Sequence, residues 1–309
     1  MISRSTLIGA LVVVELAIVG MAAKAVAGGP PGGSLGFGVP MFGGHLVESA
    51  TPLDRTFAPG PAPHVVVDVH DVHVIVETGN VATVHAVETL SKSGYLSGTI
   101  PEMTAQQTLD GVHIRTSGDS SVVAFGSFDR EVRITVPPAA QVEIASAERI
   151  DVSGLRAKLV AHIVEGPIYV SDHRGDLDLS CSDGRIVLND VQGADIAANT
   201  RDGRLMFRRV AAERIDAASN DGRIEAVDVH AVDGALTTHD GRVDVSFTGD
   251  SDATVDVRTS DGKVHVHGLT TTDDGDGSSV VHLGSGRGHF EVATNDGSIY
   301  ITRGANTHA

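Results

Sequence analysis

Three kinds of residue recur together along this chain: an acidic residue, a glycine and then a basic residue. The acidic residue and the glycine stand at Asp183, Gly184, Asp202, Gly203, Asp221, Gly222, Asp240, Gly241, Asp261, Gly262, Asp296 and Gly297. The basic residue follows in five of the units, as Arg185, Arg204, Arg223, Arg242 and Lys263, here called the basic file. These cations could bind a carbohydrate or another anion, because the guanidinium group offers a fork of N–H donors that matches acidic groups. The alternative is an ion-pair network in which each surface pair contributes ~0–1 kcal/mol.

An acidic, Gly-rich insert, Thr270–Ser279, raises the question of calcium. Read as an EF-hand loop from Asp274, the sixth position is Ser279 where Gly is needed, and the twelfth is Ser285 where Glu is needed. That loop is therefore excluded. We expect a solvated loop, with a weak calcium site as the alternative.

Two further groups of reactive side chains have simple interpretations. His265 and His267 share one face of a strand and could ligate a transition metal if a neighbouring segment supplied a third ligand, but in a chain with 15 His such closeness arises by chance. The single Cys181 excludes an intramolecular disulfide and has no partner base at a recognisable spacing, so we expect a small core residue. The sequence predicts no catalytic residue, metal or cofactor.

Alternating strands position these groups. Leu177, Leu179 and Cys181 precede the first Asp-Gly pair, and Ile186 and Leu188 follow it. A period of two places such residues on one face of a strand. The later units repeat this pattern. Asp-Gly between two strands predicts a tight turn, because Gly adopts positive φ without steric cost.

The spacing of the units favours a β-solenoid. They follow one another at 18, 19, 19, 19, 21 and 35 residues, counted from a weaker unit at Glu165. Two strands and two turns fit a coil of 18–19 residues, with equivalent positions stacked ~4.8 Å apart. A small residue recurs two positions before the Asp, at Cys181, Thr200, Ser219, Thr238, Thr259 and Thr294. Stacked cations repel, so we expect the neighbouring Asp residues to offset the basic file. A sandwich of stacked hairpins is the alternative fold.

Composition and charge limit the function. The net charge of −17 excludes an ordinary nucleic-acid binder. Aromatic residues are only 4% and Trp is absent, as expected of a thin core of aliphatic side chains. The charges of residues 1–63 cancel, so the whole net charge belongs to the remainder of the chain.

The chain divides into four segments. Residues 1–27 contain the apolar run Leu7–Val19, interrupted by Glu15, and end in small residues before Gly28. This pattern predicts a cleaved export signal, or else a membrane anchor retained over residues 5–27. Residues 28–63 form a Gly/Pro-rich linker, residues 64–303 carry the repeats, and residues 304–309 are a tail.

The repeat segment resembles the bacterial putative-adhesin family, a β-strand-repeat domain of unknown function. The resemblance rests first on the repeated units of an acidic residue, Gly and a basic residue. It rests also on Val132–Pro137 before the first coil, Ile150–Leu155 within it, and the Gly-rich Leu283–Phe290 followed by Thr294–Ile299 at the end of the repeat segment. It covers residues 64–303 and departs from the family at the insert Thr270–Ser279. The family has no catalytic motif to transfer.

Together these observations predict an exported, cell-surface or extracellular adhesin-like module that binds or supports structure and is not an enzyme. Its partner would be an envelope polysaccharide or a surface protein, not nucleic acid, and it would meet the membrane only through its N-terminal segment. A membrane-anchored envelope sensor or scaffold is the first alternative. A carbohydrate-active enzyme of the β-helix type is the second, by analogy only.

Overall fold

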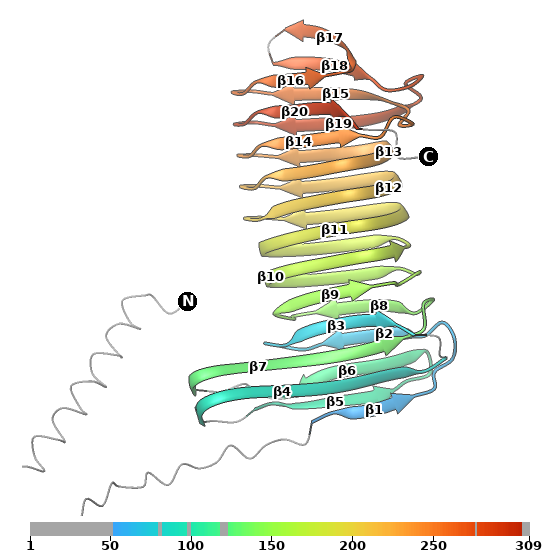
Figure 1. Cartoon of the computed structure of the whole chain (residues 1–309), viewed down its shortest axis with the longest axis vertical. Helices are drawn as coiled ribbons and strands as arrows, with labels where there is room; N and C mark the ends of the chain where they lie inside the picture. Colours follow the sequence, from blue (N-terminus) through green and yellow to red (C-terminus); the bar gives the residue numbers. More distant parts are fainter. Residues whose placement is uncertain (1–51, 80–81, 98–99, 118–122, 276, 305–309) are drawn as a thin grey trace, which may run out of the picture. The chain divides into compact units, whose positions relative to one another are not determined.

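The alternation of apolar and polar residues becomes a stack of β-strands in the computed structural model (Figure 1). The structure describes residues 52–79, 82–97, 100–117, 123–275 and 277–304, all within the second of the two units into which the chain divides, His45–Ala309. The described residues form twenty strands and no helix. The strands are β1 (Asp54–Phe57), β2 (His64–Asp68), β3 (His73–Thr78), β4 (Val84–Ser97), β5 (Glu102–Gln107), β6 (Gly111–Ser117), β7 (Val123–Val136), β8 (Gln141–Ala145), β9 (Arg149–Ser153), β10 (Leu159–Arg174), β11 (Leu177–Thr200), β12 (Arg204–Ser219), β13 (Ile224–Thr238), β14 (Val243–Phe247), β15 (Ala253–Thr259), β16 (Val264–His267), β17 (Thr270–Gly275), β18 (Ser278–His282), β19 (Gly288–Thr294) and β20 (Ile299–Arg303).

The repeats are coils of a β-solenoid. Strands β10, β11, β12 and β13 pair in parallel, so that Ile186 lies beside Ile168 on one side and Leu205 on the other. Each coil contributes one segment before the Asp-Gly positions and one after them, which we call the first and second faces. Parallel pairing between neighbouring units confirms the solenoid and excludes stacked hairpins, whose strands would pair antiparallel.

The core lies between the two faces and is built from aliphatic side chains. Ile168, Ile186 and Ile224 have no exposed surface, and the inward residues of the other coils are similarly buried. Burying one such side chain contributes about 1.5–3 kcal/mol. Among aromatics, Phe247 and Phe290 meet edge to face with ring centroids 5.4 Å apart.

The glycines of the Asp-Gly corner are needed for close packing and not for turn conformation. None of the six adopts positive φ, and β11 runs through Gly184 without a break. A Cβ on Gly222 would lie 1.6 Å from the carbonyl oxygen of Gly203 in the preceding coil, and the other glycines of the corner are similarly close to a carbonyl. The expected positive-φ turn at these positions was therefore wrong. Among the non-glycine residues with positive φ, Asp172, Asp190, Arg209 and Asp228 lie at the opposite corner, whereas Asp71 and Ser146 lie between β2 and β3 and between β8 and β9.

A file of hydroxyl groups holds the Asp-Gly corner together. Thr238 Oγ1 donates to the carbonyl oxygens of Asn220 and Gly222 at 3.2 and 3.0 Å, and Thr294 and Thr259 bond their neighbouring coils in the same way. Cys181 occupies the same file and is buried, as predicted. Burial raises the pKa of its thiol. Asn220 also accepts from the backbone N–H groups of His239 and Asp240, so the hydroxyl of Thr238 matters most for the carbonyl oxygen of Gly222.

The coils do not stack in the order of the sequence. Strands β2 and β3 lie between β6 and β7 on one side and β8 and β9 on the other. At the other end, β19 and β20 lie between β13 and β14 on one side and β15 and β16 on the other. Figure 1 shows both insertions, in blue within the green strands and in red within the orange ones.

The ends of the stack differ from the sequence expectations in two places. The insert Thr270–Ser279 contributes β17 and the start of β18, which form an antiparallel hairpin on β15 instead of a solvated loop. Strand β1 lies inside the segment expected to be linker and pairs with β4, and Leu53 before it is buried. The buried Glu88 accepts a bond from the backbone N–H of Leu53 and one from Arg130 Nε at 2.7 Å, which anchors this strand.

The predicted export segment, residues 1–27, and most of the linker lie outside the described residues. Within the described part, no helix is long and apolar enough to cross a bilayer.

Candidate functional site

Two adjoining hollows lie along the Asp-Gly corner, where the chain passes from the first face to the second. The larger, about 690 Å³, is lined by residues from three segments, among them His70, Glu148, Arg149 and Val164. The smaller, about 470 Å³, is lined by Gly166, Pro167, Gly184, Arg185, Arg204 and Met206. Gly166 and Pro167 line both, so the two hollows are continuous along the corner.

The structure brings most of the predicted basic file to this corner in one row. Pro167 pairs with Arg185, and Arg185 with Arg204, in the parallel ladder. The next coils add Arg223 and Arg242. Lys263 is displaced from the row, because β20 lies between β14 and β16. The expectation that Lys263 follows Arg242 directly was wrong, since the order of coils differs from the order of the sequence.

The carboxylates that neutralise the basic file are not the ones expected. Arg242 Nε donates to Asp244 at 2.7 and 2.8 Å, and Arg223 contacts the same carboxylate at 2.7 Å. Glu225 lies 3.8 Å from Arg223. The hydrogen bond to Asp244 raises the pKa of Arg242 above its ordinary value. The partners thus stand two residues after each arginine on the same face, because a period of two returns the side chain to that face.

The Asp residues before the glycines do not pair with the basic file. Within the described part of the chain, no ion pair joins an arginine or lysine of this file to Asp183, Asp202, Asp221, Asp240, Asp261 or Asp296, all of which are exposed. Their backbone N–H groups take part in the corner instead, as when Asp221 donates to the carbonyl oxygen of Arg201 at 3.0 Å. The predicted offset of one file by the other was wrong.

Arg185 and Arg204 differ from the rest of the row. Neither has an ion-pair or hydrogen-bond partner for its side chain among the described residues, and both are exposed. Two residues further along each strand stand Val187 and Met206, where the next coil has Glu225. With Tyr169 of the preceding coil they form a half-buried apolar strip beside the two cations. These units therefore carry free positive charge that their neighbours lack.

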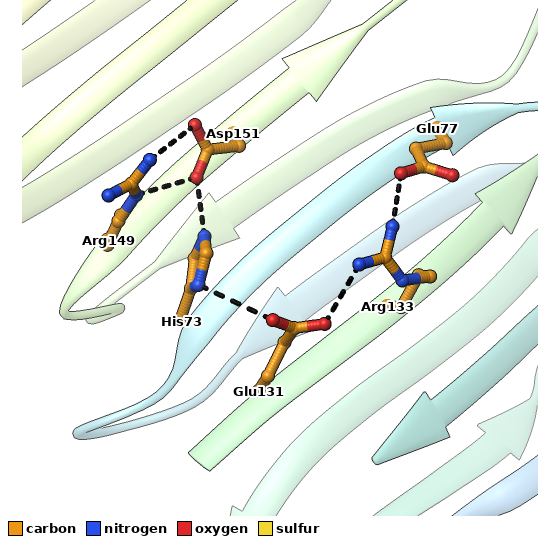
Figure 2. A network of polar contacts seen from close by, with 6 residues as sticks. All are labelled: His73, Glu77, Glu131, Arg133, Arg149 and Asp151. Carbon is orange, nitrogen blue, oxygen red and sulfur yellow. Dashed lines mark hydrogen bonds and ion pairs between the residues drawn. The ribbon is translucent and has the colours of Figure 1, made fainter. Parts of the chain in front are cut away.

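A second polar cluster lies on the second face, close to the larger hollow, and Figure 2 shows its six residues. His73 contacts Asp151 through Nε2, and its Nδ1 lies 3.8 Å from Glu131. Arg149 binds Asp151 with two bonds of 2.7 and 3.2 Å. Arg133 contacts Glu131 at 3.0 Å and also binds Glu77.

This cluster joins strands β7, β3 and β9, which are the strands where the first coil is inserted. Burial acts to raise the pKa of Asp151, but the bonds from Arg149 and His73 outweigh it and hold the pKa below its ordinary value. The hydrogen bond to Asp151 raises the pKa of Arg149. Arg149 also covers the ring of Tyr169, with 4.9 Å between its guanidinium carbon and the ring centroid. Every cation of the cluster has an acidic partner, so the arrangement fastens the inserted coil.

The remaining candidates are brought to no common site. His265 stacks on Tyr300 with ring centroids 4.5 Å apart, and Arg242 covers the same ring at 3.8 Å. No group of three or more metal-ligating side chains occurs among the described residues. The side chains of residues 273–276 lie outside that part, so calcium at the insert stays a hypothesis.

Sequence reasoning missed both hollows and the distinction within the basic file. The hollows depend on which coils are neighbours, and no local pattern encodes that. The distinction had a signal, since an acidic residue follows two positions after Arg223, Arg242 and Arg149 but not after Arg185 or Arg204.

Comparison with known proteins shows which family and which solved structures this architecture resembles. A family model described as Toastrack DUF4097 matches residues 63–302. A putative adhesin from Parabacteroides merdae is 12% identical over 82% of this chain and 97% of that chain, with a TM-score of 0.50, and shares the fold. A putative adhesin from Parabacteroides distasonis is 11% identical over 82% and 97% (TM-score 0.49), and one from Bacteroides fragilis 12% over 84% and 99% (TM-score 0.40). No curated protein matches the chain.

Proposed function

Because the chain belongs to the Toastrack DUF4097 family, we propose that it is an exported, cell-surface module that binds a partner and catalyses no reaction. The description of the Parabacteroides merdae protein as a putative adhesin supports a binding role. The predicted export segment at residues 1–27 supports the location. The partner is a component of the cell envelope or of a neighbouring surface.

One observation carries the binding role. Arg185 and Arg204 line an open hollow and have no partner among the described residues, whereas Arg223 and Arg242 in the same row are paired. An unpaired guanidinium group retains all its donors for a ligand. The rigid ladder of β10, β11 and β12 holds the two groups at a set spacing, so binding requires little ordering of the protein.

Binding is tested with the purified full chain and intact cells of the producing organism. The chain should bind the cells saturably, and the double variant Arg185→Gln/Arg204→Gln should bind them less. Absence of binding to cells and to isolated envelopes would refute the proposed function. The enzyme alternative predicts release of reducing ends from envelope polysaccharides, which our proposal does not.

Export and anchoring need a separate measurement. Intact-mass analysis of culture medium and membrane fractions distinguishes a mature chain that begins at Gly28 from one that retains residues 1–27. A chain found in the medium and beginning at Gly28 supports a released binding module. A membrane-bound chain beginning at Met1 favours an anchored sensor or scaffold. A chain confined to the cytoplasm would contradict export.

A further inference from the structure

We propose that the smaller hollow binds a linear acidic polysaccharide, with Arg185 and Arg204 holding its acidic groups and the apolar strip supporting the sugar rings. Val187 and Met206 give the main support, because Arg149 already covers the ring of Tyr169. This inference rests on the proposed function and names the ligand of the same site. It requires that the charge, the apolar strip and the backbone all favour such a ligand over other partners.

The charge of the hollow favours an anion. Its lining contains two arginines and no acidic residue. Arg208 stands two residues after Met206 on the same strand and is also exposed, with no side-chain partner among the described residues. Guanidinium groups bind carboxylate and sulfate-like groups with two parallel bonds, which adds geometric specificity to the attraction. Arg185, Arg204 and Arg208 thus place three free cations on two neighbouring strands of a chain whose net charge is −17.

The strip beside the cations suits a ring with apolar edges. Tyr169, Val187 and Met206 occupy the same outward position in three successive coils and are each half-buried. The equivalent outward position is acidic in the coils on either side of the strip, where it is Asp151 next to Tyr169 and Glu225 next to Met206. The apolar strip therefore coincides with the unpaired arginines. Ligand sites combine apolar walls with a few placed polar groups in this manner.

The backbone disfavours a peptide at this place. An extended peptide gains affinity by adding a strand to a free sheet edge. Here the segments Ile168–Ser171, Ile186–Asn189 and Leu205–Arg208 each have a neighbouring strand on both sides. No N–H or C=O row is open to a peptide backbone at these segments. A polysaccharide needs no such edge, because it binds through side chains along a surface.

The experiment measures binding of the full chain to immobilised polygalacturonate, dextran sulfate, neutral dextran and poly-L-glutamate. We expect binding to the carboxylated or the sulfated polysaccharide, with the two distinguishing which acid is preferred, and none to neutral dextran. Binding should weaken with added salt. Arg185→Gln and Arg204→Gln should each weaken it roughly tenfold or more.

Matched variants distinguish binding at a specific site from general electrostatic attraction to the protein. Arg223→Gln removes the same charge from the same row, but Arg223 is already paired, so its effect should be about threefold or less. Met206→Glu copies the acid of the next coil beside Arg204 and should abolish binding without unfolding the chain. The double variant Asp183→Asn/Asp202→Asn removes nearby negative charge and should strengthen binding. Urea unfolding of each variant checks that the fold is retained.

Four outcomes overturn the inference. An effect of Arg223→Gln as large as that of Arg204→Gln would show general electrostatic attraction. Binding of poly-L-glutamate in preference to both acidic polysaccharides would point to an acidic protein partner. Binding to cells of the producing organism with none to any acidic polysaccharide would refute the ligand but leave the proposed function, whereas binding to neither would refute both.

Discussion

The imidazole of His173 occupies a position that is apolar in the following coils. Its ladder neighbour is Val191, followed by Val210 and Val229, and all three are buried. His173 has no exposed surface, and neither ring nitrogen has a hydrogen-bond partner in the part of the chain that the structure describes. An unsatisfied buried polar group costs about 1–3 kcal/mol. We therefore expect His173→Val, which copies the next coil, to stabilise the domain at neutral pH.

The contribution of His173 to the free energy of unfolding also depends on pH, because the imidazole can be protonated. Burial lowers the pKa of His173 from 6.5 to about 4, and the nearby backbone of Gly175 and Asp176, followed by the Asp176 carboxylate, opposes this only partly. As the pH falls, the unfolded chain takes up a proton on this group before the folded chain does. The stability that the folded chain gains by keeping this imidazole neutral is therefore fully present above pH 6.5 and is lost as the pH falls toward 4. Near pH 5 the loss relative to about pH 8 amounts to about 2 kcal/mol for this one group.

The measurement is urea unfolding of the full chain at several pH values, followed by circular dichroism because the chain has no Trp. The free energy of unfolding of the wild type should fall by about 2 kcal/mol more than that of His173→Val between about pH 8 and pH 5. His267→Val is the control, because His267 is exposed and its loss should leave the pH dependence unchanged. If His173→Val and the wild type lost stability in parallel over this range, the imidazole would not be a buried neutral group and the reasoning would be refuted.

Three further substitutions test how the stack is held together, each by urea unfolding. Thr238→Val removes the hydroxyl donor of the Gly222 carbonyl, while Asn220 keeps its backbone donors, and should cost about 1–3 kcal/mol. Thr237→Val on the outer face should cost little, and equal effects of the two substitutions would show that the hydroxyl file does not stabilise the corner. Ile224→Asp places a charge in the core and should cost about 4 kcal/mol or more and unfold the array cooperatively, and a barely changed midpoint would mean that this position does not point inward. Arg130→Met leaves Glu88 buried without its cation and should cost about 3–5 kcal/mol, a loss that a solvated Glu88 would not produce.

The sequence predicted the strands and the inward residues because these depend on local spacing. Ile186 and Leu188 alternate with Arg185, Val187 and Asn189, and only Ile186 and Leu188 are fully buried in the structure. The small-residue file was also predicted, as Thr200 and Thr238 show. A period of two is a property of a single strand, so it can be found without knowing which strands become neighbours.

The predictions failed where the cause lies in a neighbouring coil. Gly222 was assigned to a turn, but a Cβ there would clash with the carbonyl oxygen of Gly203, one coil away. Arg223 was paired with the acidic residue before it, but its carboxylate partner at 2.7 Å is Asp244 of the next coil. Both errors treat a contact across the ladder as a contact along the chain. Residue spacing shows that equivalent positions stack, but it does not show which atoms then meet.

The insertion of the terminal coils follows from how solenoids end. A coil at the end of a stack pairs on one side only, so it is held less firmly than a coil with a neighbour on each side. With β2 and β3 placed one position inward, the first coil of the chain pairs on both sides, as do β19 and β20 at the other end. The outermost strands, such as β16, are then held by chain connections at both of their ends. This change in the order of the coils accounts for the irregular intervals of 21 and 35 residues after Asp240 in the sequence. The coil that follows Asp240 in the stack is the one that contains Asp296. The cluster around His73 fastens the corresponding junction near the N-terminal end, which explains why its charges are fully paired while those of Arg185 and Arg204 are not.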